Sequence, residues 1–421
     1  MQKKIRLVSA QGPTQLLNAL AILDYQRDVE GLYKCEDHLV LGGFCANSKK
    51  QVDSIMKACT DLASIWDFQS IIYLDFEKSK KQSFLQWTKQ VKLVLKLDHV
   101  DVCYVCRNWQ LFNEVLLESY KESHKICYGD GFGWLDLNDT KWQKSPINPR
   151  GYIKIDSAYL FIPIEADQAG KSFSLVDKIV QPPIYYLTNT IHRLASKLND
   201  LKEYCVNLER QSDQGFTIVT CSNYSEAGLI KDEVLDVGSS SRKSWLQWRF
   251  KLKLLAERRI LTLFSFMRIN FIPNNLKRKA LLEANMYLDQ IKSCCSRDDI
   301  ILIKPHPRET LNQSQFLYEM LSNNGYHVFR IEDEFSCLPI ELFASLLNIR
   351  KAICMNSSSS ISLPLISNLG PDSIYPCINK DIAEKYINEN LMPSDKDIEL
   401  IMNLISQSFK KVFNPTRKAN M

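Results

Sequence analysis

Residues 5–25 read IRLVSAQGPTQLLNALAILDY, and this stretch decides the predicted fold. Its first part, Ile5–Ser9, is a short apolar run of the kind that forms a buried strand. Its last part, Gln15–Tyr25, repeats leucine and alanine at helical spacing. Gly12-Pro13 separates the two patterns, so the stretch predicts a strand, a short loop and a helix.

The alternation of strand and helix patterns continues to residue 128. Strands separated by helices of about 10–15 residues are typical of βαβ units, whose strands form a parallel sheet. The further expected strands are Leu39–Phe44, Ile71–Phe76, Val100–Cys106 and Lys125–Tyr128, and the helices are Gln51–Trp66, Ser83–Leu97 and Gln110–Tyr120. The first half is therefore predicted to be Rossmann-like.

A second alternating set follows a long helical stretch at Leu187–Glu209, which we expect to lead to a hinge near residues 210–215. A lone strand-like run, Tyr159–Ile164, precedes that stretch. The strands expected in the second set are Phe216–Cys221, Asp299–Lys304, His327–Ile331, Ala352–Met355 and Ser373–Ile378. Two Rossmann-like halves joined by a hinge describe an α/β protein of GT-B type or one of periplasmic-binding-protein type, and composition favours neither.

The predicted division of the chain follows this pattern. Residues 1–210 would form an N-terminal Rossmann-like domain with the connecting helix, and residues 211–395 a C-terminal Rossmann-like domain. Residues 396–421 would form a closing helix and a basic tail.

Composition places the chain among folded globular proteins. Hydrophobic residues make up 45% and charged residues 24%, which excludes extended disorder, collagen and coiled coil for most of the chain. A net charge of +5 over 421 residues is too weak to indicate nucleic-acid binding. No apolar stretch approaches the ~20 residues of a membrane span, and no signal-peptide run opens the chain. A cytoplasmic protein is expected.

The 13 cysteines are dispersed and odd in number, which favours reduced thiols over a disulfide framework. The one CxxC, Cys103–Cys106, lies inside an apolar run, and no second pair follows to complete four metal ligands. A structural strand is the favoured interpretation.

Candidate functional residues stand where the expected strands end, because ligands bind beyond the carboxyl ends of strands in such sheets. Gly129-Asp130-Gly131 follows the strand Lys125–Tyr128. A carboxylate between glycines can approach a substrate closely. The alternative is an ordinary Asp-Gly turn.

The second candidate is Lys304-Pro305-His306-Pro307-Arg308, at the end of the strand Asp299–Lys304. Two prolines restrict the backbone on either side of the imidazole, which suits proton transfer or phosphate contact. A structural histidine is the alternative.

Two further candidates lie later in the chain. Asn356 is followed by four serines, and hydroxyls at a helix N-terminus form an anion site or a cap. Glu341 opens a helix after Pro339, where it either balances the helix dipole or accepts hydrogen bonds from ribose hydroxyls.

In this order, an acidic glycine-rich turn, His-Pro, Pro-x-Glu and a serine run resemble the motifs of the bacterial sialyltransferases. The opening residues 9–19, SAQGPTQLLNA, also look like the first strand, loop and helix of the bacterial alpha-2,8-polysialyltransferase family. The motif set spans residues 9–358, and its specificity comes from order and spacing.

The resemblance implies a GT-B, inverting glycosyltransferase that uses CMP-activated sialic acid and needs neither metal nor cofactor. It implies Asp130 as general base and His306 as general acid. The residues implied to bind the nucleotide are Lys304, Pro307, Glu341, Ser357 and Ser358, and those implied in the donor or acceptor loops are Gly12, Gln15, Gly131 and Asn223. The N-terminal domain would then face the acceptor and the C-terminal domain the nucleotide sugar.

The implied partners are a nucleotide-sugar donor and a glycan or glycolipid acceptor, with no nucleic acid. The basic tail around Lys410 and Lys411 is either solvated or drawn to anionic lipid, which would place the protein at the inner face of a membrane.

The chain departs from the family at one position. The family has two acidic residues before glycine, whereas here the first is Gly129. Asp130, or Asp136 in its place, would have to supply the base. Two alternatives therefore stay open: a GT-B transferase with another CMP- or UDP-activated sugar, such as Kdo, and a non-catalytic nucleotide- or glycan-binding protein.

Overall fold

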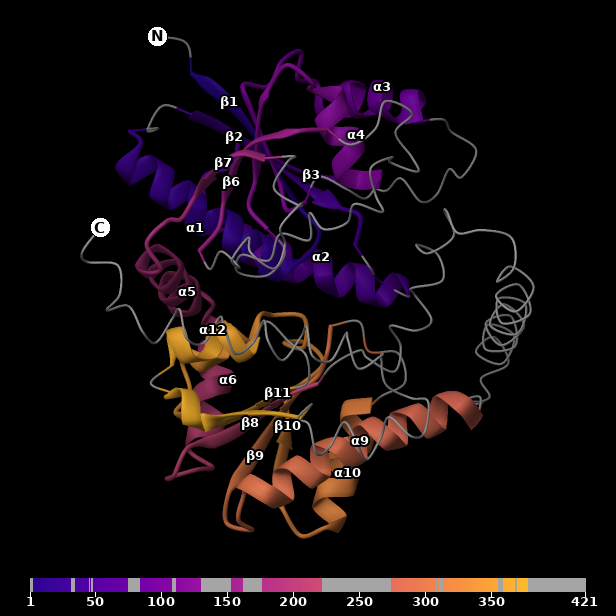
Figure 1. Cartoon of the computed structure of the whole chain (residues 1–421), viewed down its shortest axis with the longest axis vertical. Helices are drawn as coiled ribbons and strands as arrows, with labels where there is room; N and C mark the ends of the chain where they lie inside the picture. The colour runs from indigo at the N-terminus through magenta and orange to yellow at the C-terminus, as the bar shows by residue number, and fades with distance from the viewer. Residues whose placement is uncertain are drawn as a thin grey trace.

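The computed structural model contains two parallel β-sheets, one above the other in Figure 1, with helices packed against both. The residues that the structure describes are 3–31, 35–44, 46, 48–74, 84–107, 111–129, 153–161, 176–221, 274–307, 309, 313–354, 359–367 and 369–377. All strand pairs are parallel, so the predicted α/β class with two Rossmann-like domains is confirmed.

The first sheet has the strand order β3-β2-β1-β4-β5-β6-β7. Its strands are β1 (Lys4–Ala10), β2 (Cys35–Gly42), β3 (Ser70–Leu74), β4 (Val102–Val105), β5 (His124–Cys127), β6 (Ile155–Tyr159) and β7 (Val176–Val180). The first six strands follow the Rossmann order, in which the chain changes direction across the sheet between β1 and β4. A crevice is expected at that switch point.

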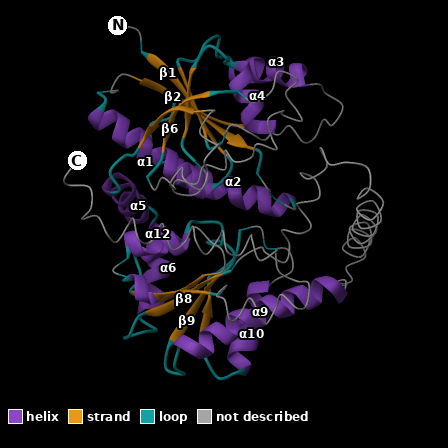
Figure 2. Cartoon of the chain, in the orientation of Figure 1, coloured by secondary structure: helices purple, strands orange, loops and turns teal. Residues whose placement is uncertain are grey.

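The helices of this half cover both faces of the sheet (Figure 2). They are α1 (Pro13–Val29), α2 (Lys49–Ala63), α3 (Phe84–Leu95) and α4 (Leu111–Ser119). Alternate residues of β1 face opposite layers: Leu7 packs in the cluster with α3 and α4, and Val8 in the cluster with α1 and α2.

The second sheet has the order β10-β9-β8-β11-β12, so its switch point lies between β8 and β11. Its strands are β8 (Phe216–Thr220), β9 (Ile300–Lys304), β10 (His327–Arg330), β11 (Ile349–Cys354) and β12 (Ile374–Pro376). Its helices are α9 (Asn274–Cys294), α10 (Gln313–Asn323), α11 (Ile340–Ala344) and α12 (Ser359–Ile366). A 3-10 turn, η4 (Pro371–Ser373), precedes β12.

Three differences from the sequence prediction concern the connecting region. The expected strand Tyr159–Ile164 lies earlier, as β6, and β7 was not predicted. The expected helix Leu187–Glu209 is two helices, α5 (Tyr185–Lys197) and α6 (Asn199–Glu209), because Leu198 has a non-helical backbone.

The segment expected to be a hinge, residues 210–215, is bonded to the second sheet. The main-chain N–H of Phe216 donates to the carbonyl of Asn348 at 2.8 Å, and the Arg350 guanidinium donates to the carbonyl of Gln214 at 3.3 Å.

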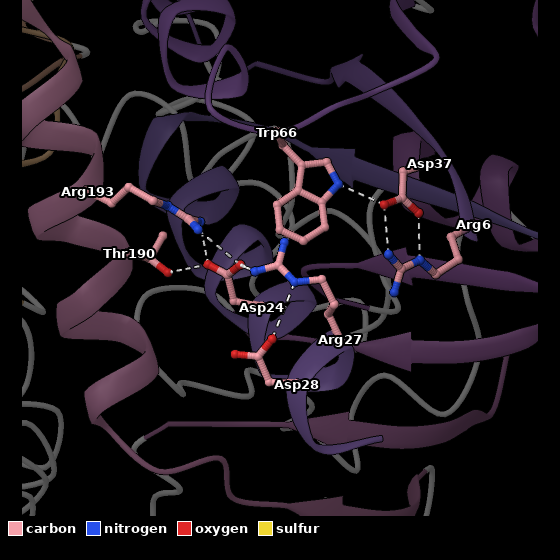
Figure 3. A network of polar contacts seen from close by, with 8 residues as sticks. All are labelled: Arg6, Asp24, Arg27, Asp28, Asp37, Trp66, Thr190 and Arg193. Carbon is pink, nitrogen blue, oxygen red and sulfur yellow. Dashed lines mark hydrogen bonds and ion pairs between the residues drawn. The ribbon is translucent and has the colours of Figure 1, made fainter. Parts of the chain in front are cut away.

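Asp24 joins α1 to α5 (Figure 3). Its carboxylate accepts a hydrogen bond from the Thr190 hydroxyl at 2.9 Å and pairs with the guanidiniums of Arg193 and Arg27. Because Asp24 is buried, these partners replace the water that its charge would otherwise require. The network attaches α5 to the N-terminal half.

Arg6 and Asp37 form a buried ion pair between β1 and β2, where they stand in register. The guanidinium is bidentate, with Nε and Nη2 lying 2.6 and 2.7 Å from the two carboxylate oxygens. The Trp66 indole donates to the same carboxylate at 2.7 Å (Figure 3).

The CxxC pair of β4 is buried, and burial raises the pKa of the Cys103 thiol to about 12, which fits the structural interpretation. Among the described helices, none combines the length and apolar character needed to cross a membrane.

Candidate functional site

The switch points of both sheets open into one cavity of about 290 Å³. From the first domain it is lined by the loop after β1, by Ile55 of α2 and by Arg107 after β4. From the second it is lined by the ends of β8 and β9, the start of α11 and Ser359. Both switch points are the places where Rossmann-like sheets bind ligands, so this cavity is the candidate site.

The wall from the first domain is the turn between β1 and α1. Helix α1 starts with Pro13 after Gly12, and Gln15 follows in its first turn. Gln11 fixes this turn: its side-chain N–H donates to the carbonyl of Gly43 at 3.2 Å, and its oxygen accepts from the Asn113 amide at 2.9 Å. The first-turn N–H groups of α1 are therefore held at the cavity.

Lys304 ends β9 and is buried. Its ammonium donates to the carbonyls of Pro305, at 3.0 Å, and of Ser336. Burial lowers the pKa of Lys304 to about 8, against the attraction of Cys337 and Glu341. Lys304 lines the cavity, and its two bonds support the loop that carries His306. Its role in nucleotide binding stays a prediction.

His306 stands at the start of a four-residue turn on the second domain's wall. The N–H of Glu309 donates to the carbonyl of His306 at 3.0 Å and closes the turn. The Glu309 carboxylate accepts from the N–H and the hydroxyl of Ser314 at 2.8 and 2.9 Å, which ties the turn to α10. The imidazole is half-buried at the cavity.

Glu341 lies in the first turn of α11, buried at the cavity. Its Oε1 accepts a hydrogen bond from Ser362 of α12 at 2.5 Å. Burial raises the pKa of Glu341, while the Ser362 bond and the charge of Lys304 oppose that rise. A carboxylate held in this way can accept hydrogen bonds from ligand hydroxyls.

The remaining lining residues include several that sequence reasoning missed: Gln11, Arg107, Thr220 and Cys221. All follow or end expected strands, so applying the strand-end rule to every strand would have found them. Ser359 was predicted only as part of the serine run, and its hydroxyl donates to that of Thr220 at 3.3 Å.

The structure brings six of the predicted residues to this one cavity: Gly12, Gln15, Lys304, His306, Pro307 and Glu341. The other five, Asp130, Gly131, Asn223, Ser357 and Ser358, lie outside the described residues. Asp136 and the chain after residue 377, with the predicted limit at 395 and the basic tail, also lie outside them.

Gly129 is among the described residues, and its backbone conformation favours glycine. Its φ of 80° lies in the left-handed region that an aspartate or glutamate would adopt only with strain. The preceding residue is fixed, because the Asn18 amide of α1 donates to the carbonyl of Tyr128 at 2.7 Å.

A second depression, of about 350 Å³, lies at the opposite edge of the first sheet. Residues 98–100, which precede β4, and residues 119–123, which precede β5, line it. It is larger than the cavity at the switch points, but it stands at the amino ends of the strands, where this fold does not place its ligands.

Within the described residues, no group of three or more His, Cys, Asp and Glu side chains could hold a metal ion. The prediction that the reaction needs no metal is not tested by this observation and stays a prediction.

No protein-family model matches the chain, and no curated protein is significantly similar to it. Among solved structures, a putative UDP-N-acetylglucosamine 2-epimerase from Listeria monocytogenes aligns over 99% of this chain and 89% of its own, with 11% identity and a TM-score of 0.43. S. aureus MnaA, solved with UDP, aligns over 98% and 95%, with 10% identity and a TM-score of 0.41.

A family 9 glycosyl transferase from Veillonella parvula aligns over 98% of both chains, with 8% identity and a TM-score of 0.35. These likenesses are too loose to carry an argument, and the architecture rests on the sheet topology itself.

Proposed function

We propose that the protein is an inverting glycosyltransferase that moves sialic acid from CMP-sialic acid to a hydroxyl of a glycan or glycolipid. The observation that supports it is the cavity where the β1–α1 turn of one domain faces His306, Pro307 and Glu341 of the other. These are motif residues of the sialyltransferase resemblance, and they come from sequence positions roughly 290 to 330 residues apart.

The proposed chemistry is displacement at the anomeric carbon. The transition state is oxocarbenium-like, and the CMP phosphate gains negative charge as its bond to the sugar breaks. A protonated His306 favours that developing charge more than the ground state, which is the condition for catalysis. Glu341 would accept hydrogen bonds from the ribose, and Ser357 and Ser358 would bind the phosphate.

The acceptor hydroxyl must lose a proton, and Asp130 is the proposed base. It lies in the sequence between two glycines, shortly after the end of β5, where ligands bind in such sheets. No metal ion or cofactor is part of the proposal, since the charge on the leaving phosphate is met by His306 and the serines.

The test is transfer from CMP-sialic acid to a panel of glycan acceptors in the presence of EDTA. His306→Ala should lower kcat by about 10²–10⁴-fold, the usual contribution of a general acid. His327→Ala, an exposed histidine at the start of β10, is the matched control and should leave kcat unchanged. Loss of transfer on chelation, or full activity in His306→Ala, would contradict the mechanism.

The choice of donor can be tested separately by binding. A nucleotide that occupies the cavity raises the unfolding temperature, so CMP, UDP and GDP can be ranked at equal concentration. We expect CMP to rank first. A UDP-first ranking would favour a transferase or epimerase with another nucleotide sugar.

Gly129 favours one further candidate, a non-catalytic nucleotide- or glycan-binding protein, because the family's first acidic residue is missing. That candidate predicts CMP binding without turnover. It also predicts that Asp130→Asn changes nothing measurable, whereas the transferase proposal predicts loss of transfer with CMP binding retained.

A further inference from the structure

Gln51 of α2 makes a hydrogen bond across the interface of the two domains. Its side-chain Nε2 donates to the main-chain carbonyl of Glu309 at 2.8 Å. Glu309 is the last residue of the turn that begins with His306, so the bond reaches the His306 turn from the opposite domain.

The His306 turn is otherwise supported from its own side. Glu309 ties it to Ser314 of α10, and the Ser314 hydroxyl in turn accepts from the Arg330 guanidinium at 2.8 Å. Gln51 adds a restraint that exists only while the domains are close together. The orientation of His306 is thereby linked to the distance between the domains.

The local sequence of α2 suggests a different role for Gln51. Ser48 caps α2, accepting from the N–H of Gln51 at 3.2 Å, and Ser48-x-x-Gln51 is the pattern of a capping box. In such a box the side-chain oxygen of the glutamine accepts a hydrogen bond from the main-chain N–H of the cap residue. The amide nitrogen points elsewhere in this structure and donates to Glu309.

The two halves share one buried core, in which α5 packs against α11 of the second domain. Asp24 holds α5 on the N-terminal half, while α6 is held on the C-terminal half by the bond from the N–H of Asn348 to Glu209, at 2.5 Å. Leu198 separates the two helices.

We infer that Gln51 is a positioning residue that couples the N-terminal domain to the His306 turn of the other domain and so sets the orientation of that turn. This inference rests on the proposed function in so far as His306 acts on the substrate. Gln51 donates to a main-chain carbonyl and does not line the cavity. Its loss should therefore lower the rate of transfer and leave CMP affinity near that of the parent.

Two substitutions of similar length separate the bond across the domains from the support of α2. Gln51→Glu keeps a side chain favoured near a helix N-terminus but has no N–H to donate. Gln51→Lys keeps donors but places a positive charge where the helix dipole disfavours it. Helix α2 should therefore be more stable in Gln51→Glu than in Gln51→Lys. The rate of transfer should be higher in Gln51→Lys than in Gln51→Glu.

The control is Lys57→Ala, which removes a different contact between α2 and the second domain, an exposed 3.9 Å ion pair with Glu334. Such pairs contribute little, so kcat should match that of the parent. Loss of the Gln51 hydrogen bond should lower kcat by about five- to tenfold in Gln51→Glu. An unchanged kcat in Gln51→Glu, or an equal fall in Gln51→Lys, would overturn the inference.

A second measurement does not depend on turnover. Hydrogen exchange at the N–H of Glu309 should be faster in Gln51→Glu than in the parent and unchanged in Lys57→Ala. If the parent transfers no sialic acid, the proposed function is wrong, but the inference about Gln51 is not affected. If the N–H of Glu309 exchanges at the same rate in Gln51→Glu and in the parent, the coupling is wrong, but the proposed function is not affected.

Discussion

The hydroxyl of Ser362 donates to the carboxylate of Glu341 at 2.5 Å, and both side chains are buried between α11 and α12. The bond keeps a carboxylate at the cavity that burial would otherwise favour in its protonated form. Helix α11 therefore presents a hydrogen-bond acceptor to the cavity, and Ser362 of α12 holds that carboxylate in place.

Removing this bond should make stability more dependent on pH. The pKa of Glu341 is raised in the folded protein, so its ionisation costs stability as pH rises from about 4.5, the unfolded value, through the raised value. Ser362→Ala should raise that pKa further and cost about 1 kcal/mol at neutral pH and less in acid. Unfolding at pH 5 and 7.5 measures the difference. An equal loss at both pH values would contradict it, and Glu341→Gln should flatten the dependence.

Lys304 should show the opposite pH dependence. Its pKa is lowered to about 8, so the folded state gives up a proton that the unfolded chain keeps. The penalty for a buried ammonium is present below about pH 8 and is relieved as pH rises towards the unfolded value. Lys304→Met, which leaves the carbonyls of Pro305 and Ser336 without this donor, should cost about 1–3 kcal/mol. The difference in the free energy of unfolding between parent and variant should widen from pH 7.5 to 9.5. A difference that narrows would contradict the lowered pKa of Lys304.

The ion pair of Arg6 and Asp37 should be costly to break from one side. Asp37→Ala leaves a buried guanidinium without its carboxylate, and the expected loss is about 3–5 kcal/mol. Asp53→Ala, an exposed position of α2, is the control and should stay within about 0.5 kcal/mol of the parent. Denaturant unfolding measures both. The double variant Arg6→Leu with Asp37→Leu should recover most of the loss, because no unpaired charge remains.

Two glycines should respond differently to the same substitution. A Cβ at Gly42 would lie 2.1 Å from the carbonyl oxygen of Leu74, a main-chain atom of the neighbouring strand β3. Gly42→Ala should therefore cost about 3 kcal/mol or more through displacement of the strand. Gly370→Ala meets nothing within 4 Å and should unfold at the parent's temperature. Equal unfolding temperatures for the two variants would show that β3 moves away at no cost.

Most strands could be predicted because buried parallel strands need continuous apolar runs, and all ten runs of the two alternating sets became strands. The strand that was missed, β7, is an edge strand with an exposed middle, and its sequence VDKIV carries no such run. The break at Leu198 was missed for a related reason. No glycine or proline marks it, and the helical pattern continues through it.

Local periodicity is enough to predict the two Rossmann-like halves and the strand ends where candidate functional residues stand, because it reports which residues are buried. Which of those ends share a cavity, and what each side chain contacts, became known from the folded chain. Lys304 supports main-chain carbonyls, and Gln51 reaches across from the other domain instead of serving α2 alone. Those contacts depend on how two separate sheets are placed, which no local pattern encodes.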